Sequence, residues 1–148
     1  MKQSAHKIKI AAVVPPSQLR YKKTKTEMAN LGRIVSAFLA TLIGGLSVIA
    51  GSSVLLKITT PNYQVLEWLV IYNVVLGVAS LFVAFKLWKQ ADYKMPAAIL
   101  ISHLLVLTIL LTAFTDTVAA DSLQAMTFRI LIWSVILLIT YVRNRNEN

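Results

Sequence analysis

Long apolar runs dominate the chain. Three of them contain no Asp, Glu, Lys or Arg: residues 34–56, 68–85 and 95–115, with lengths of 23, 18 and 21 residues. Each is close to the roughly 20 apolar residues with which an α-helix crosses about 30 Å of hydrocarbon. Apolar and polar residues do not alternate in these runs. The pattern therefore predicts three membrane-spanning helices.

A fourth apolar run, residues 130–142, has 13 residues and is too short to span a bilayer alone. It reaches a sufficient length if it begins at Ser122, although it then includes Arg129. Asp121 supports this start, because an Asp at the N-cap with Gln124 three residues later forms a capping box. We therefore predict a fourth helix whose first turns lie in the membrane interface.

These runs predict an all-α, polytopic membrane protein, an antiparallel bundle of four transmembrane helices. The connections between the runs are short, and short connections make neighbouring helices antiparallel. The expected spans cover residues 31–56, 65–85, 95–115 and 122–142.

The composition agrees with this class and argues against several chemistries. Hydrophobic residues make up 57% of the chain and charged residues 14%, against roughly 45–50% and about 25% in soluble domains. Cysteine is absent, which excludes disulfides, thiolate nucleophiles and thiolate metal ligands. The serine-hydrolase, zinc-protease and phosphate-loop motifs are also absent. We therefore expect no catalytic residue, no metal and no cofactor, and the sequence does not favour an enzyme.

Lys and Arg are concentrated on one side of the predicted membrane. Thirteen of the 15 lie before or at the start of the first span, between the second and third, or after the fourth. The other two, Lys57 and Arg129, lie on the opposite side. The positive-inside rule then places both termini in the cytoplasm. We expect the cell membrane of a bacterial type, the inner membrane, as the location.

The sequence divides into a basic, flexible N-terminal arm (residues 1–28), a transmembrane domain (29–142) and a short cytoplasmic tail (143–148). The arm is expected to attract anionic lipid, or alternatively to dock a membrane-protein partner. Nucleic-acid binding is not expected, because the arm has one Tyr and no ordered basic face.

Small residues recur at helical spacing in the first span. Steps of four residues keep to one helix face, and small residues on that face let another helix approach closely. This pattern predicts helix packing inside the bundle or, alternatively, the contact face of a homo-oligomer. The candidate packing residues, which include one from the second span, are Ser36, Ala40, Gly44, Gly51 and Gly77.

His103 is the most informative polar residue inside a span. It lies about 12 Å from the cytoplasmic end of its helix, at the depth expected for Ser134. Asn73 also lies deep in the membrane and needs a hydrogen-bond partner there. We group His103, Asn73 and Ser134 as a candidate intramembrane polar site. His103 is either a neutral, hydrogen-bonded structural residue or a contact for a proton relay, quinone or haem.

Charged residues form a second candidate group at the outer ends of the helices: Glu67, Asp116, Asp121 and Arg129. A cation as deep as Arg129 needs an anion or must extend its side chain toward the interface. We expect Arg129 to pair with Glu67 or Asp116. Such a pair would fix the helix register; the alternative is a binding site for an anion or substrate.

Two functional hypotheses follow. In the first, the protein is a non-enzymatic accessory or scaffold subunit of a membrane complex, which recruits partners through its spans and basic arm. In the second, it is a small transport or redox protein, linked to quinone or protons, that uses His103 and the outer cluster of Glu67 and Arg129.

Overall fold

The computed structural model describes residues 15–59, 66–90, 92–115 and 118–147 of the 148-residue chain. Within these ranges it contains helices and no strand. The four helices are α1 (Pro16–Leu55), α2 (Glu67–Lys89), α3 (Lys94–Ala113) and α4 (Ala120–Glu147). Each is long and apolar enough to cross a membrane. The predicted all-α fold with four membrane-spanning helices is therefore confirmed.

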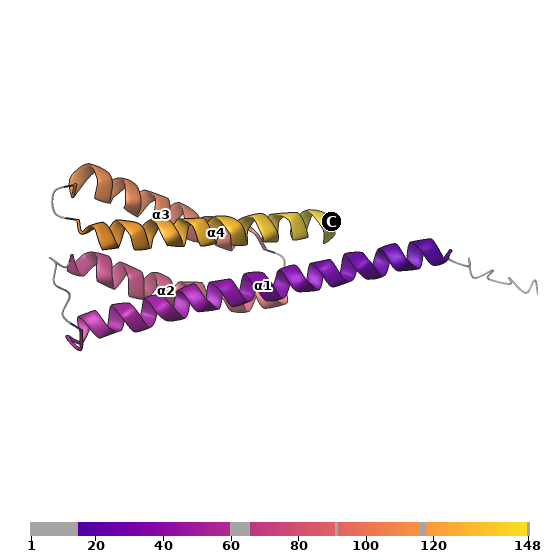
Figure 1. The fold of residues 1–148 in the computed structure, drawn as a ribbon, viewed down its shortest axis with the longest axis horizontal. Helices are drawn as coiled ribbons and strands as arrows, with labels where there is room; N and C mark the ends of the chain where they lie inside the picture. The colour runs from indigo at the N-terminus through magenta and orange to yellow at the C-terminus, as the bar shows by residue number, and fades with distance from the viewer. Residues whose placement is uncertain (1–14, 60–65, 91, 116–117, 148) are drawn as a thin grey trace, which may run out of the picture.

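The helices form two antiparallel hairpins. α1 packs against α2 and α3 against α4, and contacts between α1 and α4 join the two hairpins (Figure 1). The ends of α1 and α4 that lead to the chain termini lie at the same end of the bundle (Figure 1). We call this the terminal end, and the opposite end, where α1 stops and α4 starts, the loop end.

The outer surface of the bundle is apolar. On each helix large hydrophobic side chains point outward, and examples are Phe38 at 64% exposure, Val75 at 61%, Leu105 at 61% and Leu131 at 60%. In water so much exposed apolar surface would be unfavourable, whereas hydrocarbon is a good solvent for it. The fold therefore implies contact with a lipid bilayer along all four helices.

The interior near the terminal end is built around a tryptophan. Trp133 of α4 is fully buried and packs in a cluster with the small residues Ala37 and Ala40 of α1. Leu87 of α2 and Ile99 of α3 complete this cluster from the other two helices. The small side chains on α1 leave the space that the indole ring fills, which positions α4 against α1.

The small residues predicted on the first span lie on the face of α1 that is turned inward. Ser36, Ala40, Gly44 and Gly51 are all buried. At Gly51 a Cβ atom would lie 2.5 Å from the Val74 side chain of α2, so the two helices touch there. This face therefore packs against the protein's own helices, against α2 at Gly51 and in the cluster around Trp133 of α4 at Ala40.

Helix α1 is much longer than its span. It has 40 residues and begins at Pro16, which occupies the first helical position and is suited to it because no backbone N–H is needed there. Its length is about 60 Å, at 1.5 Å per residue. Its first turns project beyond the other helices (Figure 1). Residues 16–28, which we predicted to be part of a flexible arm, are thus helical, while residues 1–14 lie outside the described residues; the division into arm, domain and tail stays a prediction.

Helix α4 begins slightly earlier than predicted. Its first residue is Ala120, and Asp121 lies in the first turn. The backbone N–H of Ser122 already donates to the Ala119 carbonyl. The prediction that Asp121 is the N-cap is therefore wrong. An acidic side chain in the first turn still interacts favourably with the helix dipole.

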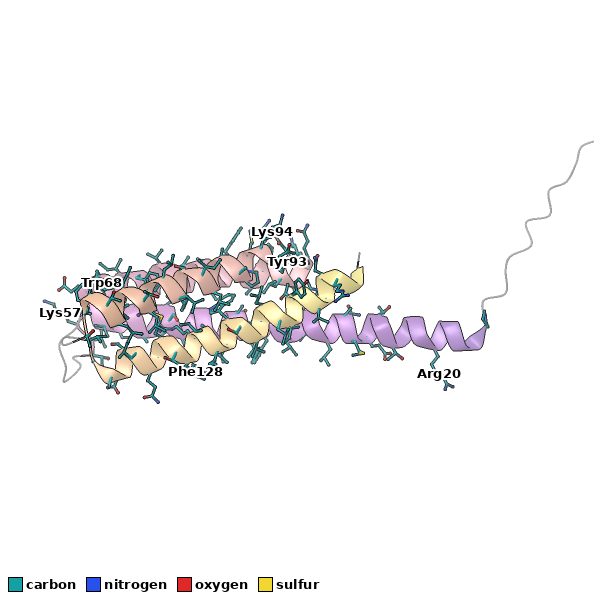
Figure 2. All side chains as sticks on the ribbon, turned by 90° about the horizontal axis from the view of Figure 1, so that it is seen from above. Arg20, Lys57, Trp68, Tyr93, Lys94 and Phe128 are labelled. Atoms are coloured by element: carbon teal, nitrogen blue, oxygen red, sulfur yellow. The ribbon has the colours of Figure 1, made fainter. Side chains whose placement is uncertain are left out.

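Helix α1 ends in a Schellman motif that has a lysine at its special position. The N–H of Lys57 donates to Val54 O and the N–H of Ile58 to Ser53 O, both at 3.0 Å. Lys57 has φ 55°, the left-handed conformation in which glycine is usual. Figure 2 shows Lys57 at the loop end of the bundle.

Aromatic side chains mark both ends of the bundle. At the loop end, the rings of Trp68 and Phe114 lie 5.6 Å apart. At the terminal end, the rings of Tyr93 and Tyr141 meet edge to face at 5.8 Å. Figure 2 shows Trp68 and Tyr93 near opposite ends. Tyr and Trp are enriched at the two interfaces of a membrane, so these pairs indicate where the bilayer would end.

Candidate functional site

Arg129 and Asn73 form the most distinctive polar contact between helices. The Arg129 Nη1 atom of α4 donates a hydrogen bond of 2.6 Å to the Asn73 Oδ1 atom of α2. Arg129 lies nine residues after Ala120, about 14 Å along the helix axis. A charged side chain at such a depth costs about 2.5–3.5 kcal/mol on insertion scales. A charge-assisted bond to the amide offsets part of that cost.

Of the two partners expected for Arg129, Glu67 does not pair with it. Glu67 is exposed at the start of α2, and among the described residues Arg129 makes no ion pair with it. Asn73 follows Glu67 by six residues, a rotation of about 240° at 3.6 residues per turn. The two side chains therefore leave α2 on different faces, and the face that turns toward α4 presents the amide. Asp116, the other expected partner, lies outside the described residues.

A cavity of about 200 Å³ lies beside this contact, between α1, α2 and α4. Apolar side chains of all three helices form most of its wall, with Val54, Val70 and Met126 among them. Arg129 and Asn73 also line it. The arginine thus faces a space that is mostly apolar, which is unusual for a cation and makes this cavity the first candidate for ligand binding.

Asp121 lines the same cavity from the first turn of α4. It precedes Arg129 by eight residues, about 12 Å along the axis. The cavity therefore has a carboxylate toward its outer end and a guanidinium deeper inside. Of the predicted outer cluster, the structure brings Asp121 and Arg129 to one cavity and leaves Glu67 exposed on the surface.

His103 belongs to a different polar group, with α2 residues on its other side. Its Nδ1 atom lies 3.0 Å from the Ile99 carbonyl oxygen of its own helix. Because a carbonyl can only accept, Nδ1 carries the proton and donates. The ring meets that of Tyr72 edge to face at 6.0 Å. Tyr72 Oη and Ser102 Oγ are 3.2 Å apart, which adds a second polar link between α2 and α3.

Ser134 does not join either group. It is exposed, and its hydroxyl donates to the Ile130 carbonyl at 2.8 Å, one turn earlier in the same helix. The three residues predicted as one intramembrane site therefore have different partners. Asn73 binds Arg129, His103 contacts Tyr72, and Ser134 faces outward. Counting residues along α4 gives the depth of Ser134 in the membrane, but it does not show which face of α4 is turned inward.

Tyr72 and Ser102 take part in these polar contacts between helices, and neither residue was predicted from the sequence. Each directly precedes a residue that was singled out, Asn73 and His103 respectively. Two adjacent polar residues in an apolar span could have predicted these contacts. Neighbouring side chains leave a helix about 100° apart, so each can reach a different neighbouring helix. The pair Tyr72–Asn73 does so here, with one residue directed to α3 and the other to α4.

The described side chains offer no cluster for a metal ion: no group of three or more His, Asp or Glu residues is close enough among them. Comparison of the chain with protein-family models, with curated proteins and with solved structures gave no match.

Proposed function

We propose that this chain is a non-enzymatic accessory or scaffold subunit of a membrane complex, in a bacterial-type inner membrane with both termini in the cytoplasm. The observation that carries the proposal is the projection of α1 beyond the bundle (Figure 1). A continuous helix holds its first turns at a fixed position relative to the spans. Such an element is suited to present a docking surface at the membrane.

The charge on this projection supports the proposal. Arg20 is exposed on it, far from the other helices (Figure 2), and three lysines follow within five residues in the same helix: Lys22, Lys23 and Lys25. A dense group of cations on a projecting helix favours an acidic partner surface or anionic lipid.

The remaining basic residues support the proposed orientation. At the terminal end, Arg33 lies over the Trp88 ring at 5.5 Å, and the Lys89 Nζ atom lies over the Phe85 ring at 4.4 Å. Cations stacked on aromatic rings are typical of the zone where a helix leaves the bilayer. Because Lys and Arg favour the cytoplasmic side, this end is the one we assign to the cytoplasm.

The second candidate function is a small transport or redox protein. The cavity beside Arg129 favours it, since a space with a charged side chain can hold a ligand. His103 gives it less support, because this side chain is 3% exposed and donates to its own helix. The two candidate functions predict different effects of mutation. Loss of function at normal abundance in His103→Ala would favour the second, whereas loss on deletion of residues 1–26 would favour the first.

Photo-crosslinking in native membranes tests the accessory role. A photoreactive amino acid at position 20 or 24, both exposed on the projection, should give a discrete protein adduct. The same amino acid at position 128, where Phe128 points outward from α4 (Figure 2), is the matched control and should react mainly with lipid. With the photoreactive amino acid at position 24, changing Arg20, Lys22, Lys23 and Lys25 to Glu should abolish the adduct. Adducts with lipid alone at position 20 and 24 would contradict a docking role.

The orientation has an independent test. The chain has no cysteine, so a single introduced cysteine can be labelled without background. Arg20→Cys should react with an impermeant maleimide only after the cytoplasmic face is opened, and Lys57→Cys should react in intact cells. Labelling of both positions from the same side would contradict the proposed topology.

A further inference from the structure

We propose that the cavity beside Arg129 binds a phosphate-type oxyanion, held by the guanidinium, with apolar groups of the same ligand against the cavity wall. The ligand is either the head of an anionic lipid or free phosphate. This inference concerns a site that the accessory role does not use, and it stands or falls independently of that role.

Arg129 has more hydrogen-bond donors than the described residues use. A guanidinium has five N–H donors, and the described residues give Arg129 one acceptor, the Asn73 side chain. Arg129 also lines the cavity. No other described side chain accepts from the remaining donors, so a group in that space can bind them, and the planar arrangement of these donors matches two oxygens of a phosphate.

The bond to Asn73 does not neutralise Arg129, because the amide has no charge. Among the described residues, no carboxylate is paired with this guanidinium, which lies inside a membrane-spanning helix. An anion bound in the cavity would neutralise that charge where the surroundings are apolar and electrostatic attraction is strong. A neutral quinone or an amine would not do so. The site therefore selects an anionic ligand.

The size and the wall of the cavity suit a phosphate together with the atoms next to it. The cavity is about 200 Å³, below the roughly 300–1,000 Å³ of pockets that enclose a whole drug-sized molecule. It has room for a phosphate and the atoms next to it. Leu69, Val70 and Met126 on its wall would contact the carbon atoms next to the phosphate, and the acyl chains of a lipid would run along the exposed surface of the bundle.

Asp121 restricts the ligand further. Its carboxylate lines the cavity about 12 Å along α4 from Arg129, and it would repel a second anionic group. A hydroxyl group of the ligand can donate to it instead. The favoured lipid head therefore carries one phosphate and, beyond it, a neutral hydrogen-bond donor such as a glycerol hydroxyl.

Native mass spectrometry of the full chain in a neutral detergent tests this. The protein is titrated with phosphatidylglycerol, with diacylglycerol, which lacks the phosphate, and with inorganic phosphate. We expect one tightly bound phosphatidylglycerol and at least tenfold weaker binding of diacylglycerol. Arg129→Gln should weaken phosphatidylglycerol binding at least tenfold. Lys57→Gln removes a cation at the same end, outside the cavity lining, and should change binding less than twofold.

A second variant and a competition experiment complete the test. Ala125→Phe fills the cavity and leaves Arg129 in place, so it should also weaken phosphatidylglycerol binding. This variant replaces Arg129→Gln if that protein does not fold. If millimolar phosphate displaces phosphatidylglycerol, the natural ligand is free phosphate. If it does not, the natural ligand is the lipid. Equal binding of phosphatidylglycerol and diacylglycerol, or equal losses in Arg129→Gln and Lys57→Gln, would overturn the proposal.

Discussion

Gly44 of α1 and Gly77 of α2 each occupy the space that the other's side chain would need. A Cβ atom on Gly44 would lie 2.8 Å from the Gly77 carbonyl oxygen, and a Cβ atom on Gly77 would lie 2.9 Å from the Gly44 carbonyl oxygen. The two backbones therefore touch where the helices cross. Helix pairs in lipid associate through such close packing, because lipid supplies no hydrophobic force between them.

We predict that Gly44→Ala destabilises the bundle while Gly45→Ala does not. The added methyl group at position 44 meets the Gly77 carbonyl, whereas at position 45 there is nothing within 4 Å of it. Forcing an extra methyl group into a close contact costs about 1–3 kcal/mol. The free energy of unfolding in mixed micelles measures the difference. Equal stability of the two variants would show that α1 and α2 do not cross at this point.

Lys57→Gly should stabilise the protein. Lys57 has φ 55°, and a non-glycine residue in the left-handed region costs roughly 1–2 kcal/mol. Glycine has no such penalty, although its greater freedom in the unfolded chain offsets part of the gain. The melting temperature should therefore rise in Lys57→Gly and stay unchanged in Lys57→Ala, which keeps the Cβ atom. A rise in both variants would point to the charge of Lys57 as the cause.

The bond between Tyr72 and Ser102 should contribute little to stability on its own. Hydrogen bonds between membrane helices contribute about 0.6 kcal/mol on average and reach about 1.7 kcal/mol. Tyr72→Phe and Ser102→Ala should each cost an amount in this range. Because both remove the same contact of 3.2 Å, the double variant should cost no more than the larger of the two. Additive losses would mean that the hydroxyls have separate partners.

The apolar runs predict the number of helices and their order, because the thickness of hydrocarbon sets a length that composition must meet. The same criterion cannot detect the first turns of α1. Residues 16–28 are rich in good helix formers such as Leu19, Glu27 and Met28, but they are too polar for a hydropathy window. The signal for their start is Pro16, which precedes a segment free of further proline until Pro61.

The polar contacts are harder to predict for a geometric reason. Depth follows from a count of residues, since each adds 1.5 Å. Rotation about the helix axis does not, because it depends on which neighbour a face meets. Glu67 was a reasonable partner for Arg129 by charge, but Asn73 leaves α2 on the face that meets α4. Likewise Ser134 has its hydroxyl on an exposed face of α4.

The bond between Arg129 and Asn73 predicts a distinct order among three variants. Asn73→Ala removes the acceptor, so it should cost about 1.5–3 kcal/mol, the range for a hydrogen bond to a charged group. Asn73→Asp keeps an oxygen at that place and adds a negative charge, so it should retain the stability or raise it. Glu67→Gln changes an exposed residue and should stay within about 0.5 kcal/mol of the parent.

Unfolding in mixed micelles, together with the steady-state amount in the membrane, measures this order. Arg129→Gln serves as the control, because removing the buried charge also removes the need for its acceptor. In that background Asn73→Ala should lose most of its effect, since the two substitutions act on one contact. A loss in Glu67→Gln as large as in Asn73→Ala would instead support the ion pair expected from the sequence. Full additivity of Arg129→Gln and Asn73→Ala would contradict the bond itself.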